Sequence, residues 1–262
     1  MDLQLHGKTA VVTGASRGIG LAVSEALTRE GVRVLGAART IPAELTAVSE
    51  AAVSADLSTA AGAAKVVDRA LTELGDIDIL INNVGAGDAD RFKLGGFLDI
   101  GDDQWRELFD LNLFSAIWMT RAALPSLLER RGAIVNVASV NSRMPSTGPV
   151  GYSEAKAALT ALGKRLSEEF APRGVRVNTV SPGVVGTSLW RDPAGFGGKM
   201  AAANGLGHQD FLAAIPEQAA ISTGRITEPE EVAALITFLA SEAAANMVGA
   251  DLIIDGGMIK TT

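Results

Sequence analysis

The chain begins with an apolar run, a glycine-rich turn and a helical pattern, and this order restricts the fold more than any other feature. Residues 8–13 are rich in β-branched side chains and predict a strand. Gly14, Gly18 and Gly20 follow, and apolar residues then recur at helical spacing. Because the unpaired amides at a helix N-terminus can receive a phosphate, this stretch predicts a dinucleotide-binding unit.

Strand and helix patterns alternate along the rest of the chain. Further strands are expected at residues 32–37, 52–55, 77–81, 133–138, 175–180 and 250–254. This alternation predicts an α/β fold with a parallel sheet that helices cover on both faces. The 262 residues, 47% of them hydrophobic, suffice for one large core, and no linker divides them. We therefore expect a single domain over residues 1–262.

Composition excludes several classes of function. A net charge of −7 and a pI near 5.0 argue against nucleic-acid or anionic-membrane partners, which need a basic face. Without cysteine the chain has neither disulfides nor a thiol nucleophile. His6 and His208 are the only histidines and cannot build a histidine-based zinc site without carboxylates. We expect no metal.

The start of the chain and its apolar runs bear on location. The first strand is expected near Lys8, which leaves no room for the basic and apolar regions of a signal peptide. No apolar run approaches the roughly 18 residues that span a bilayer. We expect a cytoplasmic protein.

Tyr152 and Lys156 stand at the head of an apolar-striped segment. Four residues make one helical turn of about 6 Å, so the phenol and the ammonium share one face. This spacing also occurs by chance, as a surface tyrosine beside a solvated lysine. Ser139, however, directly follows the strand at 133–138, and ligands of open parallel sheets bind at the carboxyl ends of the strands.

The end of the second strand indicates which cofactor is preferred. No Asp or Glu stands there to accept from the ribose 2′-hydroxyl of NAD, because Ala38 precedes Arg39. Arg39 and Arg17 can instead pair with a 2′-phosphate. We expect NADP(H), with NAD(H) less favoured. Alternatively, Arg39 is only a solvated residue at the strand end, which leaves the preference between NADP and NAD open.

The glycine spacing G-x-x-x-G-x-G after Thr13 and the Y-x-x-x-K of Tyr152 and Lys156 resemble the short-chain dehydrogenase/reductase family. Matching motifs continue in order to Gly257. The resemblance implies one doubly wound Rossmann-type domain, with a seven-stranded parallel sheet between two helical layers. It also implies an oxidoreductase that interconverts a ketone or aldehyde and an alcohol by hydride transfer with a nicotinamide cofactor.

The resemblance implies a catalytic set of Asn112, Ser139, Tyr152 and Lys156. Tyr152 is the expected acid/base, and Ser139 is expected to hydrogen-bond the substrate oxygen. A phenol titrates near 10, and we expect the Lys156 charge to lower the pKa of Tyr152 by roughly one to three units. The resemblance further implies that Lys156 holds the nicotinamide ribose and that Asn112, on a distorted helix, holds a water nearby.

The expected cofactor contacts lie in the loops that follow the strands. Asn83 and Gly85 belong to an N-N-A-G-like element in which Val84 replaces alanine, whereas Asn82 is expected to be structural. The full expected set is Gly14, Ser16, Arg17, Gly18, Ile19, Gly20, Arg39, Asp56, Leu57, Asn83, Gly85, Tyr152, Lys156, Pro182, Gly183, Val185 and Thr187.

Two segments are expected to recognise a partly apolar small-molecule substrate, whose identity the sequence leaves open. Residues 86–101, with Phe92 and Phe97, either rim the pocket or form a surface loop pinned by the two rings. Residues 188–220 lose regularity and mix apolar side chains with glycines, which favours a lid over a helical excursion packed on the core. His208 within them is more often an exposed loop residue than a substrate contact.

Three further points complete the expectation. A non-catalytic NADP-binding sensor is the alternative from another class, since a fold does not guarantee turnover. An epimerase or dehydratase is less favoured, because its G-x-x-G-x-x-G spacing is absent. The apolar stripes at 105–128 and 155–170 are larger than one substrate pocket requires. Members of the family that the chain resembles commonly pair these helices across a two-fold axis, so we expect a homodimer or homotetramer.

Overall fold

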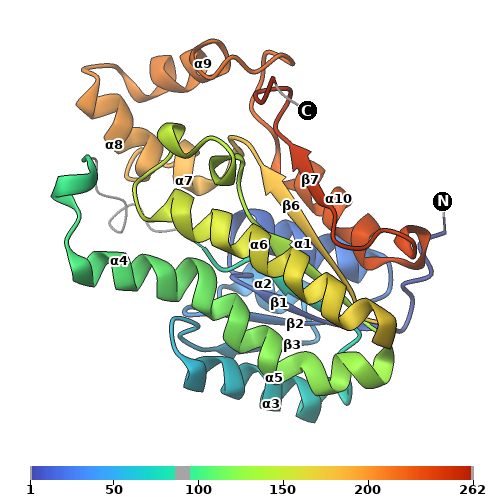
Figure 1. Ribbon diagram of the computed structural model, residues 1–262. Helices are drawn as coiled ribbons and strands as arrows, with labels where there is room; N and C mark the ends of the chain where they lie inside the picture. Colours follow the sequence, from blue (N-terminus) through green and yellow to red (C-terminus); the bar gives the residue numbers. More distant parts are fainter. Residues whose placement is uncertain (1, 86–94, 261–262) are drawn as a thin grey trace.

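The computed structural model describes residues 2–85 and 95–260, and its strands form one parallel sheet (Figure 1). The seven described strands run in the order β3-β2-β1-β4-β5-β6-β7. They are β1 (Thr9–Thr13), β2 (Arg33–Ala38), β3 (Ala51–Ser54), β4 (Ile79–Asn82), β5 (Ala133–Val137), β6 (Arg176–Pro182) and β7 (Asp251–Ile254). This order and direction confirm the predicted fold class, and the predicted strand limits shift by at most two residues.

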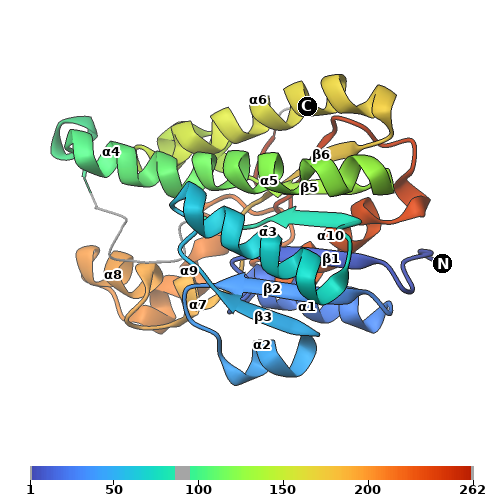
Figure 2. The same ribbon diagram turned by 90° about the horizontal axis from the view of Figure 1, so that it is seen from below.

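Helices cover both faces of the sheet (Figure 2). On one face α1 (Gly18–Arg29) packs against α2 (Ala43–Val48) and α10 (Pro229–Ala240). The other face carries α3 (Ala60–Leu74), α5 (Ser115–Arg130) and α6 (Tyr152–Phe170). Each face has its own core, with Leu27 and Ile236 fully buried in the first and Met119 and Leu127 in the second. Because both faces are covered, the central strands read as continuous apolar runs.

The helical pattern expected at residues 102–130 contains a π-helical turn. Helix α4 (Asp102–Phe109) leads into the π-helical turn η2 (Asp110–Phe114), and α5 continues from Ser115. Asn112 lies in this turn and is fully buried, with its Nδ2 donating to the Leu108 carbonyl at 2.8 Å. Such turns often occur at functional sites because the extra residue redirects the backbone. The distortion expected around Asn112 is therefore present.

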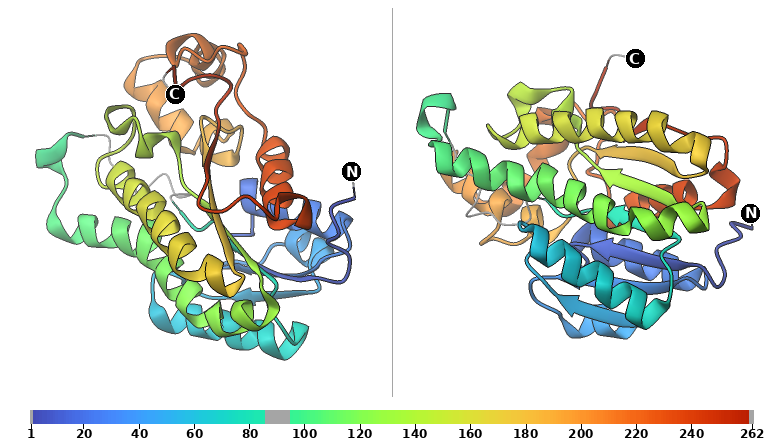
Figure 3. Two further views of the ribbon diagram at one scale, coloured as in Figure 1. Left: turned by 45° about the vertical axis from the view of Figure 1, so that its right-hand side comes forward. Right: turned by 60° about the horizontal axis from the view of Figure 1, so that its bottom comes forward.

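Three short helices lie beyond the carboxyl ends of the strands (Figure 3). They are α7 (Ser188–Arg191), α8 (Phe196–Ala203) and α9 (His208–Gln218), and Phe211 and Ile215 belong to a small core between them. The segment at 188–220 is thus more regular than the sequence indicated. We refer to these three helices as the roof helices.

The segment at 86–101 is described only in part. Residues 86–94, with Phe92, lie outside the described residues. Phe97 begins the 3-10 turn η1 (Phe97–Asp99), is 69% exposed and contacts the edge of Trp105, with ring centroids 6.2 Å apart. Of the two alternatives for this segment, a surface loop pinned by both rings is wrong for Phe97, because its ring stays largely in solvent.

Two properties of residues 2–85 and 95–260 bear on the sequence expectations. No helix in this part of the chain has the length and apolar character needed to cross a membrane. In the same residues no group of three or more histidine, cysteine, aspartate or glutamate side chains is arranged to hold a metal ion.

Candidate active site

A cavity of about 550 Å³ opens where the strands end, beneath the roof helices. Most of the predicted site residues line it. These are Gly14, Ser16, Arg17, Gly18, Ile19, Gly20, Arg39, Asp56, Leu57, Asn83, Gly85, Ser139, Tyr152, Lys156, Pro182, Gly183, Val185 and Thr187. Asn112, the remaining predicted residue, lies behind the wall of the cavity.

In the turn after β1, two glycines lie so close to neighbouring atoms that a side chain would not fit. A Cβ on Gly20 would lie 2.2 Å from the Gly14 carbonyl oxygen, and a Cβ on Gly18, at φ +55°, would lie 2.9 Å from the Thr187 side chain. Only glycine fits both places. Helix α1 begins at Gly18 in the wall of the cavity, so its unpaired amides and its dipole suit a phosphate group there.

Two neighbouring asparagines, Asn82 at the end of β4 and Asn83 directly after it, have different roles. Asn83 pins the glycine turn, since its Nδ2 donates to the carbonyls of Thr13 at 2.9 Å and Gly14 at 3.2 Å. The buried Asn82 instead donates to Asn136 Oδ1 and Thr120 Oγ1, inside the fold. The geometry agrees with the expected division between a structural Asn82 and a cavity-lining Asn83.

The end of the cavity beside β2 and β3 carries two arginines. Arg17, directly before α1, and Arg39, after β2, are both exposed and both line the cavity. Ala38 occupies the end of β2 and is 7% exposed. Asp56, after β3, is the described carboxylate in the wall at this end. A positively charged rim of this kind suits an anionic group better than a neutral hydroxyl.

Tyr152, Ser139 and Lys156 meet at the other end of the cavity. Gly151, at φ +84°, turns the chain so that α6 begins at Tyr152, and the Glu154 carboxylate accepts from the Gly151 amide at 2.6 Å. The Tyr152 hydroxyl faces the Ser139 side chain, which stands two residues beyond β5 and favours the ionised phenol. The Lys156 ammonium lies 5.8 Å from the centroid of the Tyr152 ring and donates to the Val137 carbonyl at 2.8 Å.

Burial changes the pKa of both groups on α6. Loss of hydration raises the pKa of the Tyr152 phenol, and the hydrogen bond with Ser139 opposes this only in part. Burial also lowers the pKa of the Lys156 ammonium to about 8. The expectation that the pKa of Tyr152 is lowered is wrong, because its net shift is upward. Four-residue spacing reports nearness, but the loss of water disfavours the charged form of each group.

Gly85 separates Lys156 from the π-helical turn. A Cβ at Gly85 would lie 3.1 Å from Lys156 Nζ and 3.3 Å from Asn112 Oδ1. Because glycine has no side chain, the Asn112 amide and the Lys156 ammonium can both approach the backbone at Gly85. All four predicted catalytic residues are thus gathered around one end of the cavity.

The sequence interpretation missed several residues that line the cavity. Asn141 and Thr147 come from the loop after β5, and Met258 comes from the chain after β7. No periodicity marks residues in such loops, although Asn141 stands only two places after Ser139. The segment at 188–220, expected to recognise the substrate, also contributes to the wall. Its lining residues are Ser188, Leu189, Trp190, Phe196, Met200, Phe211, Ile215 and Gln218.

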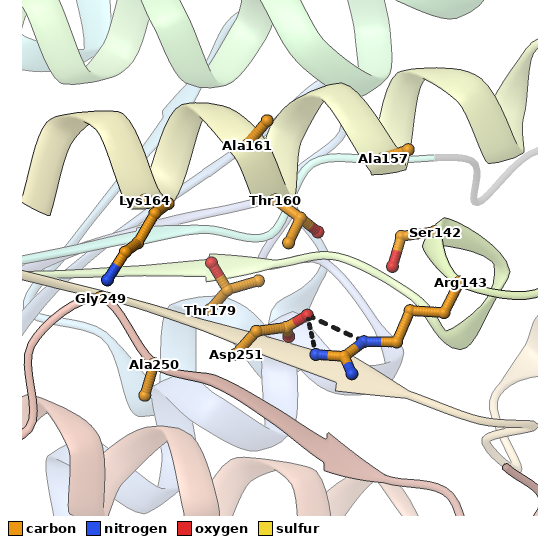
Figure 4. Close-up of a pocket in the computed structure, with 10 residues that line it drawn as sticks. All are labelled: Ser142, Arg143, Ala157, Thr160, Ala161, Lys164, Thr179, Gly249, Ala250 and Asp251. Atoms are coloured by element: carbon orange, nitrogen blue, oxygen red, sulfur yellow. Dashed lines mark hydrogen bonds and ion pairs between the residues drawn. The ribbon is translucent and has the colours of Figure 1, made fainter. Parts of the chain in front are cut away.

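A second cavity of about 400 Å³ lies between α6 and β7 (Figure 4). Its wall contains the ion pair of Arg143 and Asp251, at 2.9 Å, and Lys164 from α6. None of the predicted site residues lines it. This cavity is separate from the candidate active site.

Comparisons with known proteins cover nearly the whole chain. The sequence profile of the enoyl-(acyl carrier protein) reductase family matches residues 14–259. A 3-oxoacyl-(acyl-carrier-protein) reductase of Vibrio harveyi is 35% identical over 266 residues, which cover 98% of this chain and 99% of the relative. D-threitol dehydrogenase of Mycolicibacterium smegmatis is 35% identical over 269 residues, covering 98% and 94%.

A solved structure also resembles the chain, in fold as well as in sequence. L-sorbose reductase of Gluconobacter frateurii, determined with NADPH and L-sorbose, superposes with a TM-score of 0.91 at 30% identity, covering 100% of both chains.

Proposed function

Because the chain belongs to the short-chain dehydrogenase/reductase family, we propose that it reduces a partly apolar ketone or aldehyde with NADPH and uses Tyr152 as the acid/base. The chain is an oxidoreductase of the type that interconverts carbonyls and alcohols. The non-catalytic sensor is therefore not retained. The observation that carries the residue assignment is the meeting of Ser139, Tyr152 and Lys156 in the cavity that the glycine turn also lines.

The protonation state of the site suits reduction. A bound nicotinamide supplies the hydride to the carbonyl carbon. The raised pKa of Tyr152 keeps its phenol neutral at physiological pH, so that it can donate a proton to the carbonyl oxygen as negative charge develops there. Ser139 supplies a second hydroxyl beside the same oxygen. With a pKa of about 8, Lys156 is mostly charged at pH 7 and stabilises that developing charge.

NADP is the proposed cofactor, and Arg17 and Arg39 are the residues proposed to recognise it. Both line the cavity beside the end of β2, where Ala38 takes the place of a carboxylate. A guanidinium can form two charge-assisted hydrogen bonds with a 2′-phosphate, whereas the 2′-hydroxyl of NAD offers no charge. The other proposed cofactor contacts are the cavity-lining residues named in the sequence analysis.

The wall that the roof helices form is apolar, which supports the proposal of a partly apolar substrate. Trp190 and Phe196 meet edge to face, with ring centroids 5.5 Å apart, and Met200, Phe211 and Ile215 continue the same wall. Such a surface gains most from covering an apolar group of a ligand. The L-sorbose and D-threitol named for two relatives are polyhydroxylated, so the substrate proposed here differs in class from theirs.

The domain and assembly assignments also stay proposals. We propose one domain over residues 1–262, with the roof helices as a lid on the substrate. A homodimer or homotetramer is supported by Phe114 on the outer side of η2, which is 39% exposed and stacks on Trp118. The described part of β7 pairs only with β6, which leaves its other edge for a second copy. The cytoplasmic location stays a prediction.

A substrate screen tests this function. Cyclic and aryl ketones, 3-oxoacyl thioesters and ketoses would be offered with NADPH and separately with NADH, and the loss of reduced cofactor measured. We expect the highest kcat/KM with an apolar ketone and NADPH. A preference for ketoses would contradict the proposed substrate class, and a preference for NADH would contradict the proposed cofactor.

A further inference from the structure

We propose that Met258 is a specificity-determining residue of the substrate cavity and that Lys260 is a positioning residue that holds it in the cavity wall. The inference rests on the proposed function, because it takes the space beneath the roof helices as the substrate site. Both residues belong to the segment 255–260 that follows β7, which we call the tail. Met258 lines the cavity, whereas Lys260 is exposed and does not line it.

The tail lies against the turn that follows α9 (Figure 1). The Thr223 amide donates to the Gly256 carbonyl at 3.0 Å. Ser222 Oγ donates to the Gly257 carbonyl at 3.1 Å. Both glycines have a positive φ, and a Cβ on them would lie 2.6 Å from Thr223 Oγ1 and 2.9 Å from Ser222 Cβ, respectively. The tail backbone therefore packs directly on this turn, which only glycine permits.

Lys260 completes the connection between the tail and α9. Its ammonium donates to the Ala220 carbonyl and to Ser222 Oγ, both at 2.7 Å, and also to the Gly257 carbonyl. An ammonium has three N–H donors, and these acceptors occupy all of them. Because the bond to Gly257 returns to the tail itself, Met258 lies inside a loop that the Lys260 side chain closes.

The acceptor at Ala220 belongs to a strained turn. The Ile221 amide donates to the Pro216 carbonyl at 2.8 Å, and the Ala220 amide donates to the carbonyl one residue further on. This arrangement at a helix end usually places glycine at the left-handed position. Ala220 occupies that position, at φ +50°. The bond from Lys260 to its carbonyl therefore stabilises the turn that ends α9.

The beginning of the tail is anchored on the sheet side. The buried Asp255 carboxylate accepts from the Gly257 amide at 2.8 Å and from the Ile259 amide at 2.7 Å. A Cβ on Gly183, in the cavity wall, would lie 2.8 Å from Asp255 Cβ. Met258 is thus held by one anchor on the sheet and by another on the roof helices. Replacing Lys260 weakens the second anchor and leaves the first intact.

These contacts have a consequence for the substrate. Met258 packs on the apolar cluster that contains Phe211 and Ile215, and all three line the cavity. A methionine side chain is flexible and adapts its shape unless its surroundings fix it. Because Lys260 fixes the tail, a bulky substrate can enter only by displacing Met258 from this packing. The wall therefore favours substrates whose apolar group ends before Met258.

Two ketones that differ in bulk opposite the carbonyl test the specificity role. The probes are acetophenone and 4-tert-butylacetophenone, and calorimetry measures their binding to the full-length protein saturated with NADP. Met258→Ala shortens this part of the wall and should raise the affinity for the bulkier ketone, relative to the smaller, about tenfold, the low end for one methylene in a pocket. Lys260→Leu should shift the ratio in the same direction by roughly two- to tenfold, the equivalent of one hydrogen bond.

A spectroscopic measurement tests the positioning role without any substrate. The ¹³C-methyl signal of Met258 is assigned from its loss in Met258→Ala. In Lys260→Leu this signal should sharpen and move toward that of a solvated methionine. Lys65→Leu is the matched control, since Lys65 is also exposed and donates to a backbone carbonyl, that of Ser54 at 2.9 Å, but lies on α3 outside the cavity. It should change neither the signal nor the affinity ratio.

Each role has its own contrary result. An affinity ratio that Met258→Ala leaves unchanged overturns the specificity role. An unchanged Met258 signal in Lys260→Leu overturns the positioning role, and so does an effect of Lys260→Leu on the ratio that persists in a Met258→Ala background. Failure of the proposed function would show instead as no binding of either ketone, and the methyl signal would then still decide the positioning role.

Discussion

Replacing Lys156 by methionine should change stability in a way that depends strongly on pH. Lys156 is 3% exposed, and its described hydrogen bond is to the Val137 carbonyl. Burial lowers its pKa from 10.5 to about 8. Since a tenfold change in a proton-binding constant corresponds to about 1.36 kcal/mol, keeping this side chain charged in the folded protein costs about 3 kcal/mol at pH 7.

The sign of the pH dependence follows from proton binding. Between pH 8 and 10.5 the unfolded chain binds more protons at Lys156 than the folded protein, so this residue makes stability rise with pH. This destabilisation by the buried charge is present in full below pH 8 and disappears above pH 10.5. Methionine also leaves the Val137 carbonyl without its donor, at about 1 kcal/mol. Lys156→Met should therefore be more stable than wild type by about 2 kcal/mol at pH 7 and less stable by about 1 kcal/mol at pH 10.5.

The assay is urea unfolding of both proteins at one protomer concentration, without cofactor, at the two pH values. Comparison at each pH cancels the other titrating groups. Lys164→Met on the same helix is the matched control, since its side chain is 59% exposed, and its difference from wild type should not depend on pH. If the Lys156→Met difference were equal at pH 7 and 10.5, the account of a buried, poorly compensated charge would be wrong.

Two further predictions concern the cofactor end of the cavity. Arg39→Asp should weaken NADPH binding roughly 10- to 100-fold, the value of one charged hydrogen bond, and affect NADH far less; fluorescence titrations that weaken equally for both would contradict a 2′-phosphate contact. Gly20→Ala should abolish cofactor binding and lower the Tm, because its Cβ would lie 2.2 Å from the Gly14 carbonyl, whereas Gly101→Ala, with open space around it, should do neither. Normal NADPH affinity in Gly20→Ala would show that the turn is less constrained than described.

The features that the sequence predicted well are those carried by local pattern. Covered parallel strands appear as apolar runs, and in the glycine turn after β1 the contact of Gly20 with the Gly14 carbonyl is local. The position of Ser139 followed from topology, because it comes two residues after the carboxyl end of the central strand β5. These inferences needed no knowledge of how distant side chains pack.

The features that the sequence did not predict depend on tertiary packing. The direction in which the pKa of Tyr152 moves depends on complete burial, which a Y-x-x-x-K spacing does not report. The contact of Asn141 with Ser139 arises from the 3-10 turn η3 (Val140–Ser142), too short to leave a periodic signal. Glycines interrupt the roof helices, so their apolar residues form no clear helical stripe in the sequence. Only in the folded protein do these residues pack together around Phe211.

The central claim is that Tyr152 moves the proton, and removal of its hydroxyl tests it most directly. Tyr152→Phe keeps the ring that packs at the head of α6 and removes only the oxygen. The measurement is the single-turnover rate of NADPH oxidation with a ketone substrate, together with the Kd for NADPH. We expect an unchanged Kd and a rate at least about 100-fold lower, the low end for an acid/base group. A rate close to that of the wild type, with NADPH bound normally, would contradict the assignment.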